Sequence, residues 1–165
     1  MNHMKCVILN LGMLITVLAL FACGCQTGPQ PWNLSIKKTT PSSIQVDLIG
    51  VPESDKPSWE GYDMTKYWSD GDLRRSEADK LTQTMQMGHP WIISLDDPKW
   101  NEWLDRGASE LMIIANLPGT LPSGSADPRR LFIPLDKHAW KAKNGTLEFE
   151  VQDTIIQVLT PRNLK

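Results

Sequence analysis

The segment Leu111-Met112-Ile113-Ile114-Ala115 is an uninterrupted apolar run. Ile113 and Ile114 are β-branched, and such side chains fit the pleated, buried surface of a sheet. Short apolar runs of this kind are typical of buried strands. The segment therefore predicts a central β-strand, and the flanking sequence indicates what kind of sheet contains it.

Alternation of apolar and polar residues predicts further strands on both sides of this segment. Leu34 and Ile36 alternate with polar neighbours before a break at Thr39-Thr40-Pro41-Ser42-Ser43. Pro134 places one strand at a sheet edge or ends it, because proline cannot donate to a ladder. The expected strands cover residues 32–38, 44–48, 91–95, 111–115, 131–135, 146–151 and 155–159, and the last two form a hairpin.

Capping residues predict short helices between the second and fourth of these strands. Asp63 can accept a hydrogen bond from a free amide of a first turn, and Asp97-Pro98 adds a proline at the first helical position. Ser76 begins a further segment, up to residue 88, in which Leu81 and Met85 fall on one helical face. We therefore expect a helix in each of these three places.

These elements define the expected fold class and domain organisation. They predict a mainly β protein, an antiparallel β-sandwich of about seven strands. A short helical insertion covers about residues 58–107, and the whole domain spans residues 32–165. A chain of this length is expected to form one domain with a proper core.

The N-terminal residues have the order of a secretory signal peptide. Lys5 precedes an apolar run over residues 6–22, and small residues follow around Cys23 and Cys25. The run is shorter than the roughly 20 apolar residues of a membrane-spanning helix. We therefore expect residues 1–22 to be removed. Residues 23–31 then form a lipidated N-terminus and a flexible tether that reaches about 20 Å.

A cysteine at the expected cleavage position resembles the lipobox of bacterial lipoproteins. Leu20-Phe21-Ala22-Cys23 has a leucine three residues before the thiol, whereas the sequence before Cys25 lacks it. Cys23 is therefore the favoured site for a diacylglycerol and an N-acyl chain, and Cys25 is the alternative. Several acyl chains hold a protein stably on a bilayer. A plain signal peptide that leaves two free thiols is the competing interpretation.

The composition and motifs indicate no catalytic or metal site. Without Lys5, which is one of the 17 basic residues, the chain has 16 basic and 19 acidic side chains and a net charge of −3. This charge favours binding to neither nucleic acid nor lipid head groups. No Gly-x-Ser-x-Gly elbow accompanies His89 and His138, and no His or Cys pair in the domain has zinc-ligand spacing. Asp96-Asp97 and Asp70-Gly71-Asp72 are interpreted as turn and capping residues. We expect a non-enzymatic protein with no metal, and no cofactor besides the covalent lipid.

The order of elements resembles the lipoproteins of type VI secretion, which are transthyretin-like sandwiches. The resemblance rests on the lipobox, the strands at 32–38, 44–48 and 111–115, the aromatic helix around Tyr67-Trp68, and the final hairpin. It implies an outer-membrane protein, facing the periplasm, that docks onto the periplasmic part of an inner-membrane partner. The lack of an aspartate after Cys23 agrees with outer-membrane localisation.

In that family the loop between the first two strands contacts the partner. The resemblance therefore makes Thr39, Thr40, Pro41, Ser42 and Ser43 the candidate partner-binding residues. This loop is shorter than the family's, and Ile49-Gly50 replace a tyrosine that typically ends the second strand. The enlarged insertion and the loop at 117–130 are alternative contact regions.

Two main functional hypotheses follow, and a hydrolase with an unrecognised site is a third. The first is a lipid-anchored envelope protein that assembles or docks a type VI-like secretion complex through protein–protein interaction. The second depends on the seven tryptophans, all of which follow the tether. Large rings usually fill a core, but one or two exposed rings would allow a stand-alone lipoprotein to bind a glycan or small ligand.

Overall fold

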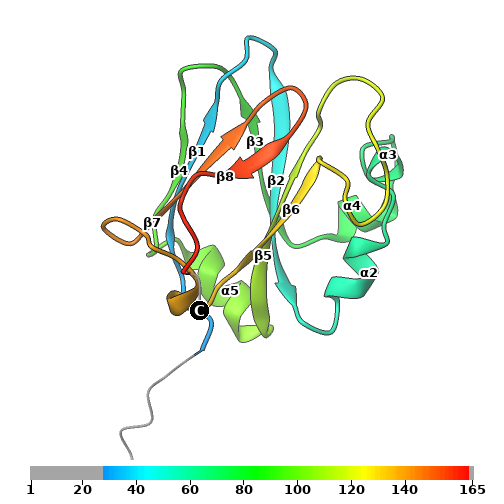
Figure 1. Ribbon diagram of the computed structural model, residues 1–165. Helices are drawn as coiled ribbons and strands as arrows, with labels where there is room; N and C mark the ends of the chain where they lie inside the picture. The colour runs from blue at the N-terminus through cyan, green and yellow to red at the C-terminus, as the bar shows by residue number, and fades with distance from the viewer. Residues whose placement is uncertain (1–27, 164–165) are drawn as a thin grey trace, which may run out of the picture.

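The computed structural model describes residues 28–163 and shows two packed β-sheets (Figure 1). One four-stranded sheet has the order β4-β1-β7-β8 and the other has the order β3-β2-β5-β6. The strands are β1 (Asn33–Lys38), β2 (Ile44–Pro52), β3 (Lys80–Met85), β4 (Trp91–Ile93), β5 (Ala108–Ala115), β6 (Arg130–Pro134), β7 (Thr146–Val151) and β8 (Ile156–Val158). The helices are α2 (Lys56–Glu60), α3 (Met64–Tyr67), α4 (Leu73–Glu77), α5 (Pro98–Asp105) and the 3-10 helix η2 (Lys137–Ala139).

The predicted mainly β sandwich is confirmed, and antiparallel pairs dominate it. β1 and β7 are the exception, because they run parallel over six paired positions. The other ladders between these strands are antiparallel, including the predicted β7–β8 hairpin. The predicted signal peptide and both candidate lipidation sites, Cys23 and Cys25, lie outside the described residues.

The helix expected over residues 76–88 is wrong, because β3 occupies this region and pairs with β2 along its whole length. Leu81 and Met85 do share a face and pack into the core. A spacing of four residues puts two side chains on one face of a helix and also on one face of a strand. The pair therefore could not distinguish the two structures. With this strand included, the described domain has eight strands, where about seven were expected.

The main core lies between the two sheets and is closed at one end by α5. Trp100 and Trp103 of α5 are almost fully buried, and their indole nitrogens donate to the carbonyl oxygens of Ser94 and Asp79, both at 3.0 Å. Asp97 caps this helix as predicted, since its carboxylate accepts from the Lys99 amide at 2.9 Å. The helix is therefore held to the ends of both β3 and β4.

A second, smaller core lies on the outer face of the β3-β2-β5-β6 sheet, where α2, α3 and α4 cover it (Figure 1). Met112 and Ile114 point into this core, whereas Leu111 and Ile113 point into the main one. β5 is consequently buried on both faces. This double burial explains why its sequence is continuously apolar, and it confirms the predicted central strand.

Polar side chains hold the helices on this sheet. Asp47 of β2 is fully buried, and its carboxylate accepts hydrogen bonds from Tyr67 Oη at 2.9 Å, Arg75 Nε at 3.0 Å and Thr82 Oγ1 at 2.7 Å. Burial and the neighbouring Asp47 carboxylate raise the pKa of Tyr67, so its hydroxyl stays protonated as a donor. One carboxylate thereby joins β2, α3, α4 and β3.

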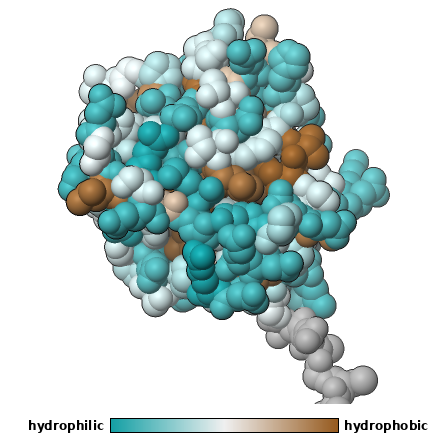
Figure 2. Space-filling view, turned by 180° about the vertical axis from the view of Figure 1, so that it is seen from behind, coloured by the Kyte–Doolittle hydropathy of each residue, from teal (hydrophilic) through white to brown (hydrophobic). Residues whose placement is uncertain are grey.

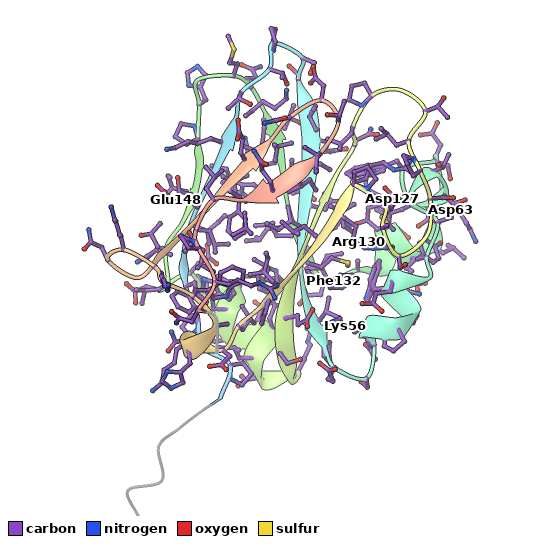
Figure 3. All side chains as sticks on the ribbon, in the orientation of Figure 1. Lys56, Asp63, Asp127, Arg130, Phe132 and Glu148 are labelled. Atoms are coloured by element: carbon purple, nitrogen blue, oxygen red, sulfur yellow. The ribbon has the colours of Figure 1, made fainter. Side chains whose placement is uncertain are left out.

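Arg130 of β6 makes a second connection (Figure 3). It joins the helices to the loop that leads into β6. Its guanidinium donates to the carbonyl oxygens of Glu60 at 2.6 Å, Tyr62 at 3.0 Å and Gly124 at 2.8 Å, and also to Trp59. Burial lowers its pKa. The carbonyl groups surrounding this buried cation tie the loop at 117–130 to the helical layer.

Gly50 provides a test of this packing. A Cβ atom at Gly50 would lie 2.4 Å from Cγ of Trp103, which is closer than real Cβ atoms approach. Gly50→Ala should therefore lower the free energy of unfolding by about 1–3 kcal/mol, as overpacking does. Urea unfolding followed by tryptophan fluorescence measures this loss. The control is Gly61→Ala, whose Cβ would meet its nearest atom at 3.5 Å; equal losses in both variants would contradict the packing described.

Candidate functional site

The predicted partner-binding residues, 39–43, connect β1 to β2 and cross from one sheet to the other. Figure 1 shows this connection at the top of the molecule, beside the β3–β4 connection (86–90) and the β7–β8 turn (152–155). We call these three segments together the loop end. The described chain begins and ends at the opposite end, beside α5 and η2 (Figure 1). The loop end therefore lies far from the point at which the chain enters the domain.

Asp153 in the β7–β8 turn holds the 39–43 loop in place. Its Oδ1 accepts hydrogen bonds from Lys38 Nζ at 3.0 Å, from Thr40 Oγ1 at 2.6 Å and from Ser42 Oγ. The ammonium group of Lys38 also donates to the Thr40 carbonyl oxygen at 3.0 Å. The loop is thus fixed by side chains from both of its flanks and from the neighbouring turn.

The charge state of Asp153 follows from these contacts. The hydrogen bonds from Ser42, Thr40 and Lys38, in that order of effect, lower the pKa of Asp153 from 3.8 to about 2. The side chain of Lys38 is fully buried, and a buried ammonium group requires a partner. Because the folded pKa is depressed, the stabilisation is fully present above about pH 4 and is lost as the pH falls toward 2.

Along the 39–43 loop, successive side chains point alternately toward solvent and toward Asp153. Thr40 and Ser42 are half-buried and bind Asp153, whereas Thr39, Pro41 and Ser43 are exposed. The exposed side chains stand on a loop whose backbone is already ordered. A preformed loop loses less conformational entropy when it binds a partner.

The β3–β4 connection adds a second exposed surface to the loop end. The His89 amide donates to the Gln86 carbonyl oxygen at 3.3 Å, and Gly88 has φ +82°, so the chain turns tightly. Met87 is 53% exposed in this turn. The adjoining pocket of about 310 Å³ is lined by Gln83, Thr84, Met85, Gln86, His89, Pro90 and Trp91.

Charge is almost absent from the loop end. Among residues 39–43, 86–90 and 152–155, Asp153 is the one carboxylate or ammonium group, and it is already paired. The centres of protein–protein interfaces are similarly depleted of charge. The rear face of the molecule is mostly hydrophilic and shows apolar side chains in a few groups (Figure 2). The loop end therefore has the character of a protein-binding surface.

The other polar residues considered in the sequence do not converge on a catalytic arrangement. His89 lies in the β3–β4 connection, and His138 lies in η2 at the opposite end (Figure 1). Asp72 and Asp97 cap α4 and α5. Within residues 28–163, no group of three or more His, Cys, Asp or Glu side chains is placed to hold a metal ion. No helix in the same range is long and apolar enough to cross a membrane.

Most of the tryptophans belong to the cores. Five of the seven are at most 7% exposed: Trp32, Trp59, Trp100, Trp103 and Trp140. Trp68 is partly exposed, but the Arg75 guanidinium lies 4.3 Å from the centre of its ring. Trp91 is partly exposed beside the β3–β4 pocket. Ligand binding through exposed tryptophans would therefore have to use Trp68 or Trp91.

Sequence reasoning did not identify Asp153, which lies in the turn of the predicted hairpin. A signal was present, since a single acid follows β7, while β1 ends in a lysine and a hydroxyl-rich loop follows it. The parallel pairing of β1 with β7 brings Lys38 opposite Val151 and so places Asp153 beside the loop. Without that pairing, there is no reason to connect two segments that lie so far apart in the sequence.

Comparisons with known proteins identify the fold. No protein-family model and no curated protein matches the sequence. A chain solved as "Type VI membrane complex" superposes with a TM-score of 0.54 and 16% identity, covering 79% of this chain and 98% of that one. A chain solved as "T6SS protein TssM C-terminal domain (869-1107) from EAEC" gives 0.50 and 13%, covering 78% and 99%. The T6SS lipoprotein TssJ1 from Pseudomonas aeruginosa gives 0.47 and 11%, covering 82% and 99%.

The first two similarities confirm, at the level of the fold, the predicted resemblance to type VI secretion membrane-complex proteins. The aligned structures are covered almost completely, so the shared region is the whole sandwich. At 13 to 16% identity, the shared property is the fold.

The Asp153 contacts predict a pH-dependent stability. In Asp153→Asn, the amides of residues 39–43 should exchange with deuterium faster than in the wild type, because Lys38 and the two hydroxyl groups lose their anionic acceptor. The variant should also unfold at a lower urea concentration at pH 7, and this difference should shrink as the pH falls from about 4 toward 2. Asp70→Asn, in an exposed turn, serves as the control. A difference that is the same at pH 7 and near pH 2 would contradict the assignment.

Proposed function

We propose that this chain is a lipid-anchored protein of the cell envelope that docks onto, or helps to assemble, a type VI-like secretion membrane complex. The supporting observation is its fold, because the superposition covers 98% of the length of a chain solved as "Type VI membrane complex". A component of such a complex acts by binding, and this agrees with the charge-poor loop end.

β1 runs from the end at which the chain enters the domain to the loop end, so these two ends are opposite. The chain enters at the end where Gln30 N donates to the Leu135 carbonyl oxygen at 3.1 Å and Pro29 pairs with Asp136. β1 then runs from Asn33 to Lys38, directly before the loop end. A lipid on Cys23 would hold the entry end at the membrane. The loop end would then point away from that membrane, toward a partner.

Outer-membrane localisation, facing the periplasm, is part of the proposal. Gly24, rather than aspartate, follows Cys23. The partner is then the periplasmic part of an inner-membrane protein, which the loop end would meet across the periplasm. The exposed side chains available for this contact include Thr39, Pro41, Ser43, Met87 and Ile155.

The lipid anchor can be tested in cells by metabolic labelling with a palmitate analogue. Cys23→Ser should abolish the label, because it removes the thiol that accepts the diacylglycerol, whereas Cys25→Ser should keep it. Loss of label only in Cys25→Ser would move the anchor to the alternative cysteine. A wild-type chain without label would refute the lipid anchor.

The docking surface can be tested with carboxylates placed on the charge-free loop end. Pro41→Glu and Met87→Glu should each lower recovery of the inner-membrane partner from solubilised envelopes about tenfold or more, because an unpaired charge is costly to desolvate in an interface. Quantitative mass spectrometry of the affinity-purified complex measures the recovery.

The matched control for these substitutions is Leu73→Glu, because Leu73 is 72% exposed on α4, in the helical layer. Recovery should be unchanged in this control. A loss with Leu73→Glu, together with normal recovery in both loop-end variants, would place the contact on the helical layer instead.

A further inference from the structure

Four basic side chains gather near the entry end, and none of them has an ion-pair partner among the described residues. They are Lys137, Lys141, Lys143 and Arg162, and all four are exposed. We call these four residues the basic edge. By contrast, Lys99 of α5, at the same end, is already paired with Asp79 and Glu102.

The basic edge is held in a fixed shape by the C-terminal segment. The Lys141 amide donates to the Pro161 carbonyl oxygen at 2.9 Å, and Asn163 N donates to the Ala139 carbonyl oxygen at 2.9 Å. The Arg162 guanidinium lies 5.0 Å from the centre of the Trp140 ring. Arg162 is therefore kept beside the segment that carries the three lysines.

This edge directly adjoins the place where the chain enters the domain. The indole nitrogens of Trp140 and Trp32 donate to the carbonyl oxygens of Pro134 at 2.8 Å and Leu135 at 3.3 Å. Pro29 pairs with Asp136, the residue before Lys137. The chain from Cys23 to Pro29 can span at most about 20 Å. A lipid on Cys23 would therefore keep the basic edge close to the membrane surface.

The edge also borders a wide groove. This groove of about 670 Å³ lies on the outer face of the β4-β1-β7-β8 sheet, where Ser35, Thr146 and Glu148 are exposed or half-buried. Figure 3 shows Glu148 on this sheet, on the side away from the helical layer. Lys141 and Lys143 line the groove, together with Asn144 and Thr160. Ammonium, hydroxyl and amide groups are donors that suit phosphate oxygens, and Glu148 is the one acid among the lining residues.

We propose that the basic edge rests against anionic phospholipid head groups of the membrane that holds the lipid anchor. The proposal rests on the proposed anchor, because the short tether brings the edge to that surface. Anionic head groups attract lysine and arginine within a Debye length, about 8 Å at physiological salt. This contact orients the domain on the membrane and directs the loop end away from it.

The test uses the lipidated protein reconstituted in vesicles of phosphatidylethanolamine and phosphatidylglycerol that carry a head-group quencher. A fluorophore is attached at Asn144→Cys or at Pro41→Cys, each in a Cys25→Ser background. Quenching should be at least twofold stronger at position 144 than at position 41, and 0.5 M salt should reduce the difference. Lys141→Glu with Lys143→Glu should also reduce it, whereas the charge-matched pair Lys37→Glu with Lys66→Glu should not.

Vesicle flotation reports the anchor separately from the basic edge. If the protein floats and both positions are quenched equally, the basic edge does not contact lipid, although the anchor stands. If the protein does not float, the proposed anchor is wrong. The edge is then tested by sedimenting the same chain with phosphatidylglycerol or phosphatidylcholine vesicles. Equal sedimentation overturns the proposal, and several-fold greater sedimentation with phosphatidylglycerol supports it.

Discussion

The buried ammonium group of Lys38 is the constraint on which the loop end depends. β1 pairs with β4 on one side and with β7 on the other, so every second side chain of the strand points into the core. Leu34 and Ile36 fill two of these positions, and Lys38 occupies the next one. A charge at such a position needs an anion and further hydrogen bonds. Asp153 supplies the anion, and its remaining contacts order the 39–43 loop that the proposed partner would meet.

A second buried charge organises the other side of the molecule. Asp47 ties α3, α4 and β3 to β2, and the helices then cover a sheet face that an ordinary sandwich leaves to solvent. The helical layer is fixed by this carboxylate and by the carbonyl contacts of Arg130.

Much of the fold could be predicted because its signals are local. Period-two patterns located β1, β2 and β7, and the caps Asp63 and Asp97 located α3 and α5. The error at residues 76–88 arose where a spacing of four residues is compatible with both helix and strand. The candidate site was harder to predict because its parts are joined only by sheet topology. Net charge also concealed the basic edge, because the sequence is acidic overall. Lys137, Lys141 and Lys143 are close in the sequence, and the fold adds the distant Arg162 to them beside η2.

In the proposed arrangement, the domain is held to a membrane at one end and binds its protein partner at the other. Photo-cross-linking in intact cells, with a photoreactive amino acid at position 41 or at position 73, distinguishes this arrangement from others. Position 41 should link to an inner-membrane component of the secretion complex, and position 73 should not. Links to that component from position 73 alone would show that the binding surface lies on the helical layer and not at the loop end.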